Sequence, residues 1–519
     1  MPFRLVTSVL GKRGVQEIYT AVAPRAVTPH LTRPSPGVRQ FHFSQCRCQQ
    51  QEQSAPSSRE DASNPSAQRT QTEKPKAASP EQASRDQLSD WENNPDLSIS
   101  KFSELPGKNF GVNQHIIINE EFKEALRQIL WQFRAPIRYA FAYGSGVFPQ
   151  SAKATTGSTS LHPNPPEAIS KVQGGNQKMI DFIFGVSYSQ HWHSLNLQEH
   201  RDHYSALGSL GSYAVSKVQD SIGAGCYFNP YITVNGVLIK YGVVNLDTLC
   251  RDLSEWDTLY LAGRLQKPVK ILRDNPSVRL ANQVNLISAV RVALLLLPEN
   301  FTEQELYSTI AGISYRGDPR MSVGGDDPKK VSNIVKYQLE NFRRLYAPLI
   351  DNLPNISFND SVCKTEGWLD DPGVNAKLQQ SMDPVTRGHM VRRLPEAFRK
   401  KLYFEYQSKF KIPRREFNEM MEKVKDEDPE RIRRREGGPF EQRIARDIDD
   451  GGLKTEVEQV IEKTIRWPSF SQSVKSVFTA GAKKSWRYVG EKRAKAKAGA
   501  KQEKNEPEVN KESAKKKEQ

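Results

Sequence analysis

The sequence predicts an α+β fold in which a small mixed sheet is followed by mainly helical sequence. Short β-rich apolar runs at 138–144, 178–186 and 231–244 occur within one stretch of the chain. From about residue 281 the apolar residues recur instead at helical spacing. The 519 residues, of which 37% are hydrophobic, leave room for two or three domains.

Each element has its own signal. At 115–133, Phe122, Leu126 and Ile129 recur at helical spacing. The run 178–186 is apolar on both faces, which is typical of a central strand. Asn235-Gly236 predicts a hairpin, because a tight hairpin turn needs positive φ at both positions. Further helices are expected at 246–264, 282–297, 302–311 and 328–347.

The ends of the chain differ in composition from its middle. The first fifty residues contain seven basic residues against a single acid, Glu17, a pattern typical of a mitochondrial presequence or of a disordered basic tail. The predicted order is a presequence (1–45), a disordered linker (46–108), a first domain with the sheet (109–280), a helical domain (281–375), a charged helical region (376–465), an amphipathic helix (466–490) and a disordered tail (491–519).

Charge and cysteine content narrow the class of protein. A net charge of +15 favours an anionic partner, whether nucleic acid, nucleotide phosphates or an acidic membrane. Five scattered cysteines argue against a disulfide scaffold or structural zinc and for a reducing compartment. The longest apolar run, at 292–298, is too short to span a membrane and predicts a core helix.

The run "YAFAYGSGVF" ends in Gly144-Ser145-Gly146, where small residues leave backbone N–H groups uncovered. Bare backbone of this kind suits the close approach of a phosphate. The turn lacks the Lys-Ser/Thr of a Walker A loop and the third glycine of a dinucleotide fingerprint. An ordinary tight turn is the alternative interpretation.

Asp181 lies inside the next apolar strand, where a carboxylate is costly unless it is paired or bound to a metal. A Gly-Ser turn followed by a strand with an acid is the layout of polymerase-β-like nucleotidyltransferases, in which the turn holds a triphosphate and the acids hold Mg²⁺. The usual second acid is missing, because position 183 is Ile. We expect another carboxylate to complete the metal site, and Asp252 is the candidate.

Two further groups have alternative interpretations. His191, His193, His200 and His203 lie close in sequence, but without an outer ligand they are a weak zinc signal. The favoured interpretation is that some of them bond to phosphate or close a helix at the active site. Lys240 lies among apolar neighbours in the second strand of the hairpin. It could extend to water from an edge strand or reach a phosphate.

The segment 466–490 predicts a basic amphipathic helix that begins near Pro468-Ser469. Its apolar stripe consists of Phe470, Val474, Val477 and Phe478. Such a helix is typical of a membrane interface, where basic residues add attraction to anionic lipid. The alternative is a helix that packs on its own protein.

Seven blocks, in order, resemble the mitochondrial translocator assembly and maintenance family, the mitochondrial-type phosphatidate cytidylyltransferases (CDP-diacylglycerol synthases). They are "YGSGVF", "MIDFIFGV", "WHSLN...HYS", "GAGCYFNPYITVNGVLIKYGVV", "LYLAGRLQKPVKI", "ISYRGDPRM" and "PSFSQSVKSVFTAG". Together they cover about 110–345 and the C-terminal helix.

The resemblance implies a polymerase-β-like nucleotidyltransferase domain, a winged-helix-like domain and peripheral attachment to the matrix side of the mitochondrial inner membrane. It implies that CTP and phosphatidate give CDP-diacylglycerol and diphosphate with Mg²⁺, for cardiolipin synthesis. It matches Gly144, Ser145 and Gly146 to the loop that holds the nucleotide phosphates, Asp181 to the metal-binding strand, and His203, Lys240 and Arg264 to polar positions of the pocket. The individual roles are our own inference: Tyr143 and Arg264 bind the nucleotide with the loop, Asp252 joins Asp181 at the metal, and Lys240 and His203 act with Asp181 in catalysis.

Two other functions stay open on sequence alone. A non-catalytic factor that maintains the import translocase would account for the missing acid at Ile183. Nucleotide transfer to RNA would suit the basic charge, but no aromatic-basic nucleic-acid surface is evident, so we expect no nucleic-acid partner. No sequence signal sets an oligomeric state.

Overall fold

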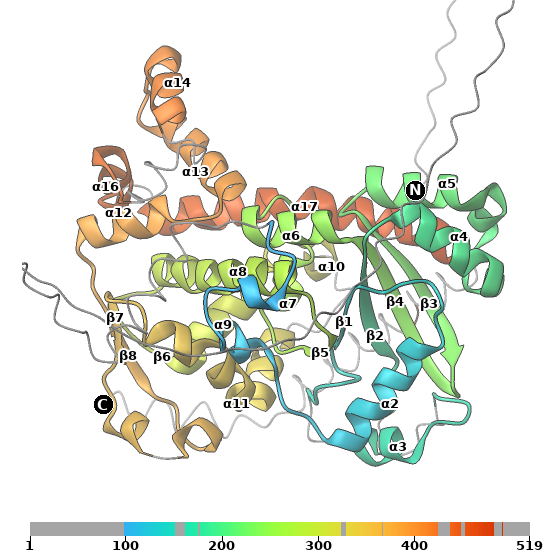
Figure 1. Cartoon of the computed structure of the whole chain (residues 1–519). Helices are drawn as coiled ribbons and strands as arrows, with labels where there is room; N and C mark the ends of the chain where they lie inside the picture. Colours follow the sequence, from blue (N-terminus) through green and yellow to red (C-terminus); the bar gives the residue numbers. More distant parts are fainter. Residues whose placement is uncertain are drawn as a thin grey trace, which may run out of the picture. The chain divides into compact units, whose positions relative to one another are not determined.

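The computed structural model describes residues 98–150, 161–174, 177–322, 329–365, 367–423, 436–447, 452–481 and 490. In this part of the chain, a five-stranded mixed sheet has the order β3-β4-β2-β1-β5 and a three-stranded sheet has the order β6-β8-β7 (Figure 1). Helices make up most of the remainder. The predicted α+β class is confirmed.

The larger sheet is built as its sequence pattern predicted. Its strands are β1 (Tyr139–Tyr143), β2 (Ile180–Val186), β3 (Cys226–Val234), β4 (Val237–Asn245) and β5 (Lys270–Arg273). β2 is the middle strand, antiparallel to β1 and parallel to β4. The β3–β4 hairpin turns at Asn235 and Gly236, whose φ angles of 48° and 74° are both positive.

Alternating side chains divide the residues of this sheet between two cores. Phe182 and Phe184 pack with α2 (Glu120–Trp131), α3 (Glu167–Gln173) and α4 (Ser189–Glu199) on one face. Ile183 belongs to the core on the other face, with α6 (Leu246–Glu255) and α8 (Pro276–Leu296). Asp181 therefore shares the α8 side of the sheet, because it lies two residues from Ile183.

The expected helices at 282–297, 302–311 and 328–347 correspond to α8, α9 (Glu303–Ile313) and α11 (Lys330–Ile350). The expected domain boundary at 280/281 falls inside α8, and a single core extends from Leu105 to Ile465. Among the described residues, α8 alone is long and apolar enough to span a membrane, yet 89% of its most apolar window is buried. It is a core helix, as predicted.

The smaller sheet consists of β6 (Asn300–Thr302), β7 (Ile356–Phe358) and β8 (Lys377–Gln380), so it extends beyond the expected end of the helical domain at 375. Near it, Glu303 and Arg343 form a fully buried ion pair, with Nη2 and Oε1 2.6 Å apart and Nε and Oε2 2.9 Å apart. This pair joins α9 to α11.

The other described helices are α5 (Gly211–Ser221), α7 (Ala262–Leu265), α10 (Pro319–Ser322), α12 (Pro384–Arg392), α13 (Glu396–Lys409), α14 (Arg414–Lys423), α16 (Pro439–Ala445) and α17 (Gly452–Ala480). The predicted linker 46–108 was drawn too long, because Leu105 is in the core and a 3₁₀ helix spans Phe102–Glu104. The predicted presequence and tail lie outside the described residues.

Helix α17 begins at Gly452 and passes through Pro468, so the prediction that it starts near Pro468 was wrong. In Figure 1 it extends from α13 to the neighbourhood of α5. Its first half packs in the core through Val457, Val460 and Ile461, which gives the second half a rigid base.

Candidate active site

A cleft opens where β1, β2 and β4 meet α7, α11 and α17. It holds about 1540 Å³ of unfilled space, counting its open mouth. Residues of the glycine turn, Asp181 and Lys240 form its wall on the sheet side. The opposite wall comes from α7, which follows β4 closely in the sequence, and from the more distant helices α11 and α17.

The glycine turn lies directly against the strand that carries the acid. Gly144 has φ +80° and a Cβ placed on it would be 3.5 Å from Asp181 Oδ2. A Cβ on Gly146 would be 2.7 Å from the carbonyl oxygen of Met179, closer than packing allows. The turn therefore needs bare backbone for its close approach to β2.

Backbone N–H groups of this turn have different roles. Those of Val147 and Phe148 donate to the carbonyl of Gly144, over 3.0 and 2.9 Å. Within the described part of the chain, the N–H groups of Ser145 and Gly146 have no acceptor. Of these two residues Ser145 lines the cleft, where an anion could accept from its N–H group.

Asp181 and Lys240 are directly paired across β2 and β4, and Lys240 Nζ is 3.7 Å from Asp181 Oδ1. Because β4 lies between β3 and β2, Lys240 is not on an edge strand, which excludes the edge-strand interpretation. Its ammonium group also lies 4.6 Å from the centre of the Phe228 ring. Asp181 Oδ1 is buried without a hydrogen-bond donor among the described residues.

This oxygen is the observation that fits a metal ion. Mg²⁺ takes oxygen ligands and commonly uses only one or two protein carboxylates, with phosphate and water supplying the rest. Ile183, where a second acid was expected, is fully buried in the core. The sheet side of the cleft thus offers one carboxylate, that of Asp181, and a bound phosphate and water could supply further ligands.

Arg264 follows the turn that leads into α7 and lies at the same wall. Its guanidinium is 4.0 Å from the centre of the Tyr260 ring, and its Nε is 3.4 Å from the hydroxyl of Tyr143. Burial raises the pKa of Tyr143 to about 12, so this hydroxyl stays protonated near neutral pH. Arg264 and Tyr143 are therefore brought together, as expected.

The cleft is rich in positive charge. Five cationic residues line it against two acids, Asp181 and Asp318; they are Lys178, Lys240, Arg264, Lys267 and Lys330. Burial, with Arg264 and Lys330 nearby, holds the pKa of Lys267 well below its usual range. This excess of cations suits a polyanion.

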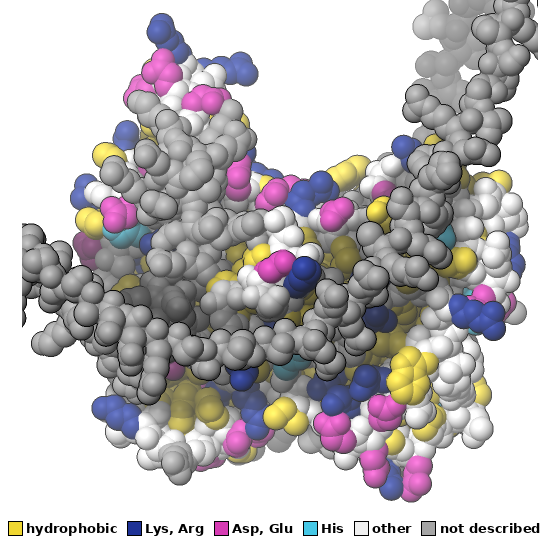
Figure 2. Space-filling view, in the orientation of Figure 1, with side chains coloured by type: hydrophobic (Ala, Val, Ile, Leu, Met, Phe, Trp, Pro, Cys, Tyr) yellow, Lys and Arg dark blue, Asp and Glu magenta, His cyan; other side chains and the backbone are white. Residues whose placement is uncertain are grey.

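Outside the cleft the charge is mixed. On the face drawn in Figure 2, the described basic and acidic side chains are interspersed rather than gathered in one broad basic patch.

Asp252 does not belong to this cleft, and its predicted role as a metal ligand is wrong. Its Oδ1 accepts from the backbone and hydroxyl of Thr258, and its Oδ2 accepts from the N–H groups of Leu261 and Ala262, all within 3.0 Å. Four bonds leave it no role as a metal ligand. It shapes the turn into α7 and so places Arg264.

His203 is also misplaced by the sequence-based prediction. Its Nδ1 is 2.9 Å from the hydroxyl of Tyr241, whose side chain belongs to the α2 side of the sheet. Lys240, the preceding residue of β4, faces the opposite side. The sheet therefore separates His203 from Asp181, and His203 does not line the cleft.

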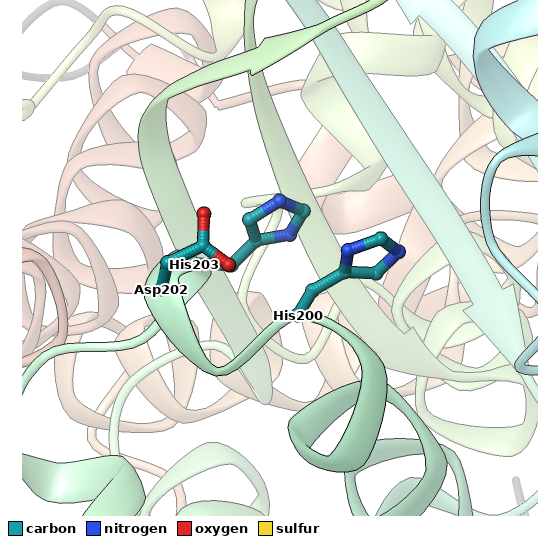
Figure 3. Close-up of side chains that lie close together, drawn as sticks. All are labelled: His200, Asp202 and His203. Atoms are coloured by element: carbon teal, nitrogen blue, oxygen red, sulfur yellow. The ribbon is translucent and has the colours of Figure 1, made fainter.

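Figure 3 shows His200, Asp202 and His203, whose ligand atoms lie within 4.8 Å of one another. The two imidazole rings are stacked, 4° from parallel with centres 4.5 Å apart. Zinc lies in the plane of each imidazole that binds it, about 2.0–2.1 Å from the nitrogen. Stacked parallel rings lie in separate planes and do not share such an ion, so this cluster is not a zinc site.

His193 is a core residue, whose ring nitrogens are each 2.8 Å from a partner, Tyr204 Oη and Gln219 Oε1. Burial lowers its pKa to about 4. The histidine-rich segment thus supports the far face of the sheet instead of binding phosphate.

The second half of α17 packs on the protein through its polar face. Gln472 donates to the carbonyl of Cys226 over 3.0 Å, and Lys475 donates to the carbonyl of Gln219 over 3.1 Å. The apolar side chains of the predicted stripe are solvent-exposed instead: Phe470, Val474, Val477 and Phe478, together with Trp467, are 43–71% exposed. The helix is held in place while its apolar face stays open.

Sequence reasoning missed Lys267, Lys330 and Tyr315. Nothing in their local pattern distinguishes them from other residues, because they reach the cleft from three separate segments: the turn after α7, the turn after α9 and the start of α11. Only the approach of α7 to α11 brings them together.

The sheet, the glycine turn and Asp181 in a cationic cleft define the class: an α+β protein whose cleft suits a phosphate-bearing substrate. Comparison with known proteins gives the family. The family model for mitochondrial phosphatidate cytidylyltransferase matches residues 126–495, and the chain belongs to this family. Relatives of that name are enzymes that transfer a nucleotidyl group.

Similarity extends over different lengths in different relatives. The Saccharomyces cerevisiae enzyme is 42% identical over 272 residues, which are 52% of this chain and 65% of that protein. The Xenopus laevis enzyme is 37% identical over 368 residues, 70% of this chain and 92% of that protein. The Mus musculus enzyme is 36% identical over 372 residues, which are 71% of this chain and 93% of that protein. The chain thus spans slightly less than two thirds of the yeast protein and nearly all of the vertebrate ones.

Proposed function

We propose that this chain is a phosphatidate cytidylyltransferase, which converts CTP and phosphatidate into CDP-diacylglycerol and diphosphate. The observation that carries the proposal is Asp181, whose Oδ1 has no hydrogen-bond donor among the described residues and lies beside a glycine turn in a cationic cleft. Relatives named for this activity support the choice of substrates.

The nucleotide binds at the sheet side of the cleft, in a domain of polymerase-β-like type that a winged-helix-like domain follows. The N–H groups of Ser145 and Gly146 donate to the triphosphate, and Lys240 and Arg264 offset its charge. Gly144 and Gly146 allow the phosphates to approach the backbone. Tyr143, protonated at neutral pH, orients Arg264 through its hydroxyl.

Asp181 would hold Mg²⁺, which supplies charge neutralisation at the reacting phosphates when it is bound. Because Ile183 is buried and Asp252 is occupied, phosphate and water oxygens complete the shell. Lys240, whose Nζ lies 3.7 Å from Asp181 Oδ1, places a positive charge beside the carboxylate.

An oxygen of the phosphatidate phosphate attacks the α-phosphorus of CTP and forms a new P–O bond. The bond from that phosphorus to the bridging oxygen of the β-phosphate breaks, and diphosphate leaves with the electron pair. Both reactants are anionic, so catalysis depends on positioning them and on cations around the transferred group. The cleft residues Lys240 and Arg264 meet this requirement.

The acyl chains can stay in a bilayer if the protein lies on it. The exposed apolar face of α17, with Trp467 at one end and Phe478 at the other, suits a membrane interface. We place the protein on the matrix side of the mitochondrial inner membrane, feeding cardiolipin synthesis. Its basic N-terminus and relatives named as mitochondrial support this location.

The experiment incubates purified protein and Mg²⁺ with phosphatidate liposomes and each of the four nucleoside triphosphates in turn. Release of diphosphate and formation of CDP-diacylglycerol with CTP alone are the expected results. A parallel arm offers RNA in place of lipid. Transfer to RNA, or no diphosphate in any arm together with a stable complex with translocase subunits, would replace the proposal.

A further inference from the structure

The glycine turn is held from outside the cleft by a glutamine at the end of α3. Gln173 Nε2 donates to the carbonyl of Gly146 over 2.8 Å and to the carbonyl of Lys178 over 3.1 Å. Its Oε1 accepts from the backbone N–H of Lys178 over 2.8 Å. One side chain therefore ties the turn that follows β1 to the backbone that leads into β2, three residues before Asp181.

A buried histidine joins this glutamine to a third strand. His162 is only 1% exposed, and its Nε2 lies 3.1 Å from Gln173 Oε1. Its Nδ1 accepts from the backbone N–H of Leu238, in β4, over 2.9 Å. Because Nδ1 is an acceptor, the ring is neutral and carries its proton on Nε2, which donates to Gln173. Burial lowers the pKa of His162, which favours this neutral form.

These contacts use the whole amide group of Gln173. An amide nitrogen has two N–H donors, and the amide oxygen accepts two hydrogen bonds. The backbone of Gly146, the backbone of Lys178 and the ring of His162 account for all four. No other side chain of this length combines two such donors with an acceptor, so the position requires glutamine.

The segment that carries both residues is itself docked on the sheet. In Figure 1, α3 lies at the end of the sheet where the β3–β4 hairpin turns. There the N–H of Asn164 donates to the carbonyl of Gly236 over 3.1 Å. A Cβ on Gly236 would overlap the carbonyl oxygen of Asn164, so the hairpin glycine leaves the space in which this segment packs. The glutamine therefore holds the glycine turn from a fixed base.

We propose that Gln173 and His162 are positioning residues for the nucleotide, which fix the glycine turn against β2 so that its backbone meets the triphosphate beside Asp181. Neither residue lines the cleft, so both act through the turn and not by touching the substrate. The bond from Gln173 also holds the carbonyl oxygen of Gly146 outside the cleft, where it does not repel an anion. This inference rests on the proposed function, which assigns the triphosphate to the turn.

The first test removes the two hydrogen bonds that Gln173 donates. Gln173→Glu keeps the length of the side chain and an accepting oxygen, but it donates to neither carbonyl. We expect the Kd for CTP, measured by isothermal titration calorimetry, and the KM for CTP to rise roughly tenfold. The KM for dihexanoyl phosphatidate, an acceptor that is soluble as a monomer, should stay near that of the wild type. Gln128→Glu, the same change at an exposed glutamine of α2, is the control.

The second test separates the hydrogen bonds from the added charge and joins the two residues. Gln173→Met has a similar volume and no charge but loses all four bonds, so its Kd for CTP should rise at least as far as in Gln173→Glu. His162→Asn keeps an acceptor for the N–H of Leu238 and loses the link to Gln173, so we expect a smaller rise. In the double variant the Kd should equal that of Gln173→Met alone, because His162 acts through Gln173.

The outcomes distinguish the inference from the function on which it rests. A wild-type protein that neither binds CTP nor releases diphosphate overturns the proposed function. An active wild type whose Kd for CTP is unchanged in Gln173→Glu and Gln173→Met, or whose KM rises equally for both substrates, overturns the positioning role alone. Additive losses in the double variant would remove His162 from it. Circular dichroism and the thermal midpoint of each variant check the fold, and Gln173→Glu carries the test if a variant with Gln173→Met or His162→Asn does not fold.

Discussion

At the scale of single residues, the sequence indicated the glycine turn, Asp181, Lys240 and Arg264, but it misplaced Asp252 and His203. The turn and the strand are local features with a recognisable pattern. Asp252 was misassigned because sequence cannot show that four donors already occupy a carboxylate. His203 was misassigned because it lies in a 3₁₀ helix outside the strands, so the face of the sheet it packs on follows from tertiary packing rather than from strand alternation.

Replacing Asp181 tests the centre of the site. Asp181→Asn keeps the shape and removes the charge that would hold the metal, so we expect CTP-dependent turnover to fall by about a hundredfold or more. The thermal midpoint should change little, since Asp181 Oδ1 accepts no hydrogen bond from the described residues. Asp202→Asn, an exposed change outside the cleft, is the control. Near-normal turnover of Asp181→Asn would contradict the assignment.

Substitution of Gly146 tests why the turn requires residues without side chains. In Gly146→Ala the new methyl group would lie 2.7 Å from the Met179 carbonyl, so the turn must move away from β2. We expect a higher KM for CTP and a lower thermal midpoint. The free energy of unfolding should fall by about 1–3 kcal/mol. Gly107→Ala, where no atom lies within 4 Å of the added methyl, should behave as the wild type. Equal behaviour of the two variants would mean that the close approach is unimportant.

At the scale of elements, strands and helices were largely predictable because their apolar periodicity is local. The hairpin at Asn235-Gly236 and the central position of β2 followed from turn chemistry and from a strand that is apolar on both faces. The start of α17 was wrong because Pro468 is tolerated inside a helix that the core supports from Gly452 onward. The buried face of α17 could not be predicted. An amphipathic helix usually buries its apolar face, whereas this one packs through Gln472 and Lys475 and exposes its apolar side chains.

Polar substitutions on the exposed apolar face of α17 should weaken membrane binding without unfolding the protein. Val474→Ser and Phe478→Ser remove exposed apolar area, so we expect sedimentation with anionic liposomes to weaken by roughly tenfold per residue. Turnover of monomeric dihexanoyl phosphatidate should persist. Val385→Ser, at an exposed valine of α12, provides the comparison. Unchanged sedimentation of both α17 variants would show that another surface meets the bilayer.

Because of the ion pair between α9 and α11, replacing Arg343 should cost much more unfolding free energy than replacing the adjacent Arg344. Arg343→Met leaves Glu303 buried without its partner, which should cost about 3–5 kcal/mol of unfolding free energy. Arg344→Met breaks an exposed pair with Asp370 and should cost less than about 1 kcal/mol. Urea denaturation measures both. Similar values for the two variants would mean that the buried pair adds no more stability than the surface one.

At the scale of the whole molecule, the cleft depends on one core that holds the sheet and the helices together. Its walls come from segments as distant as Gly144 and Ser469, and the expected boundary at 280/281 would have divided them. The sequence therefore predicted the sheet side of the site and Arg264 of α7, and it missed the residues that come from α11 and α17. Lysines such as Lys267 acquire their role only through this packing.

A buried histidine on the face of the sheet opposite Asp181 should make the protein less stable in acid. Burial lowers the pKa of His193 to about 4, below the unfolded value of about 6.5, so the unfolded chain binds the proton more readily. Stability should therefore fall as the pH drops from about 6.5 toward 4, by about 2 kcal/mol at pH 5. Nearby, burial raises the pKa of Asp220, which opposes this loss at the acidic end of the range.

His193→Gln isolates this contribution, because glutamine keeps one polar link toward Gln219 and does not titrate. Urea midpoints at pH 7 and pH 5 give the measurement. The variant should be less stable than the wild type at pH 7, yet lose about 2 kcal/mol less between the two values. Since His193 lies on the face opposite Asp181, the KM for CTP at pH 7 should be unchanged. An identical loss of stability in both proteins would assign the acid sensitivity to another group.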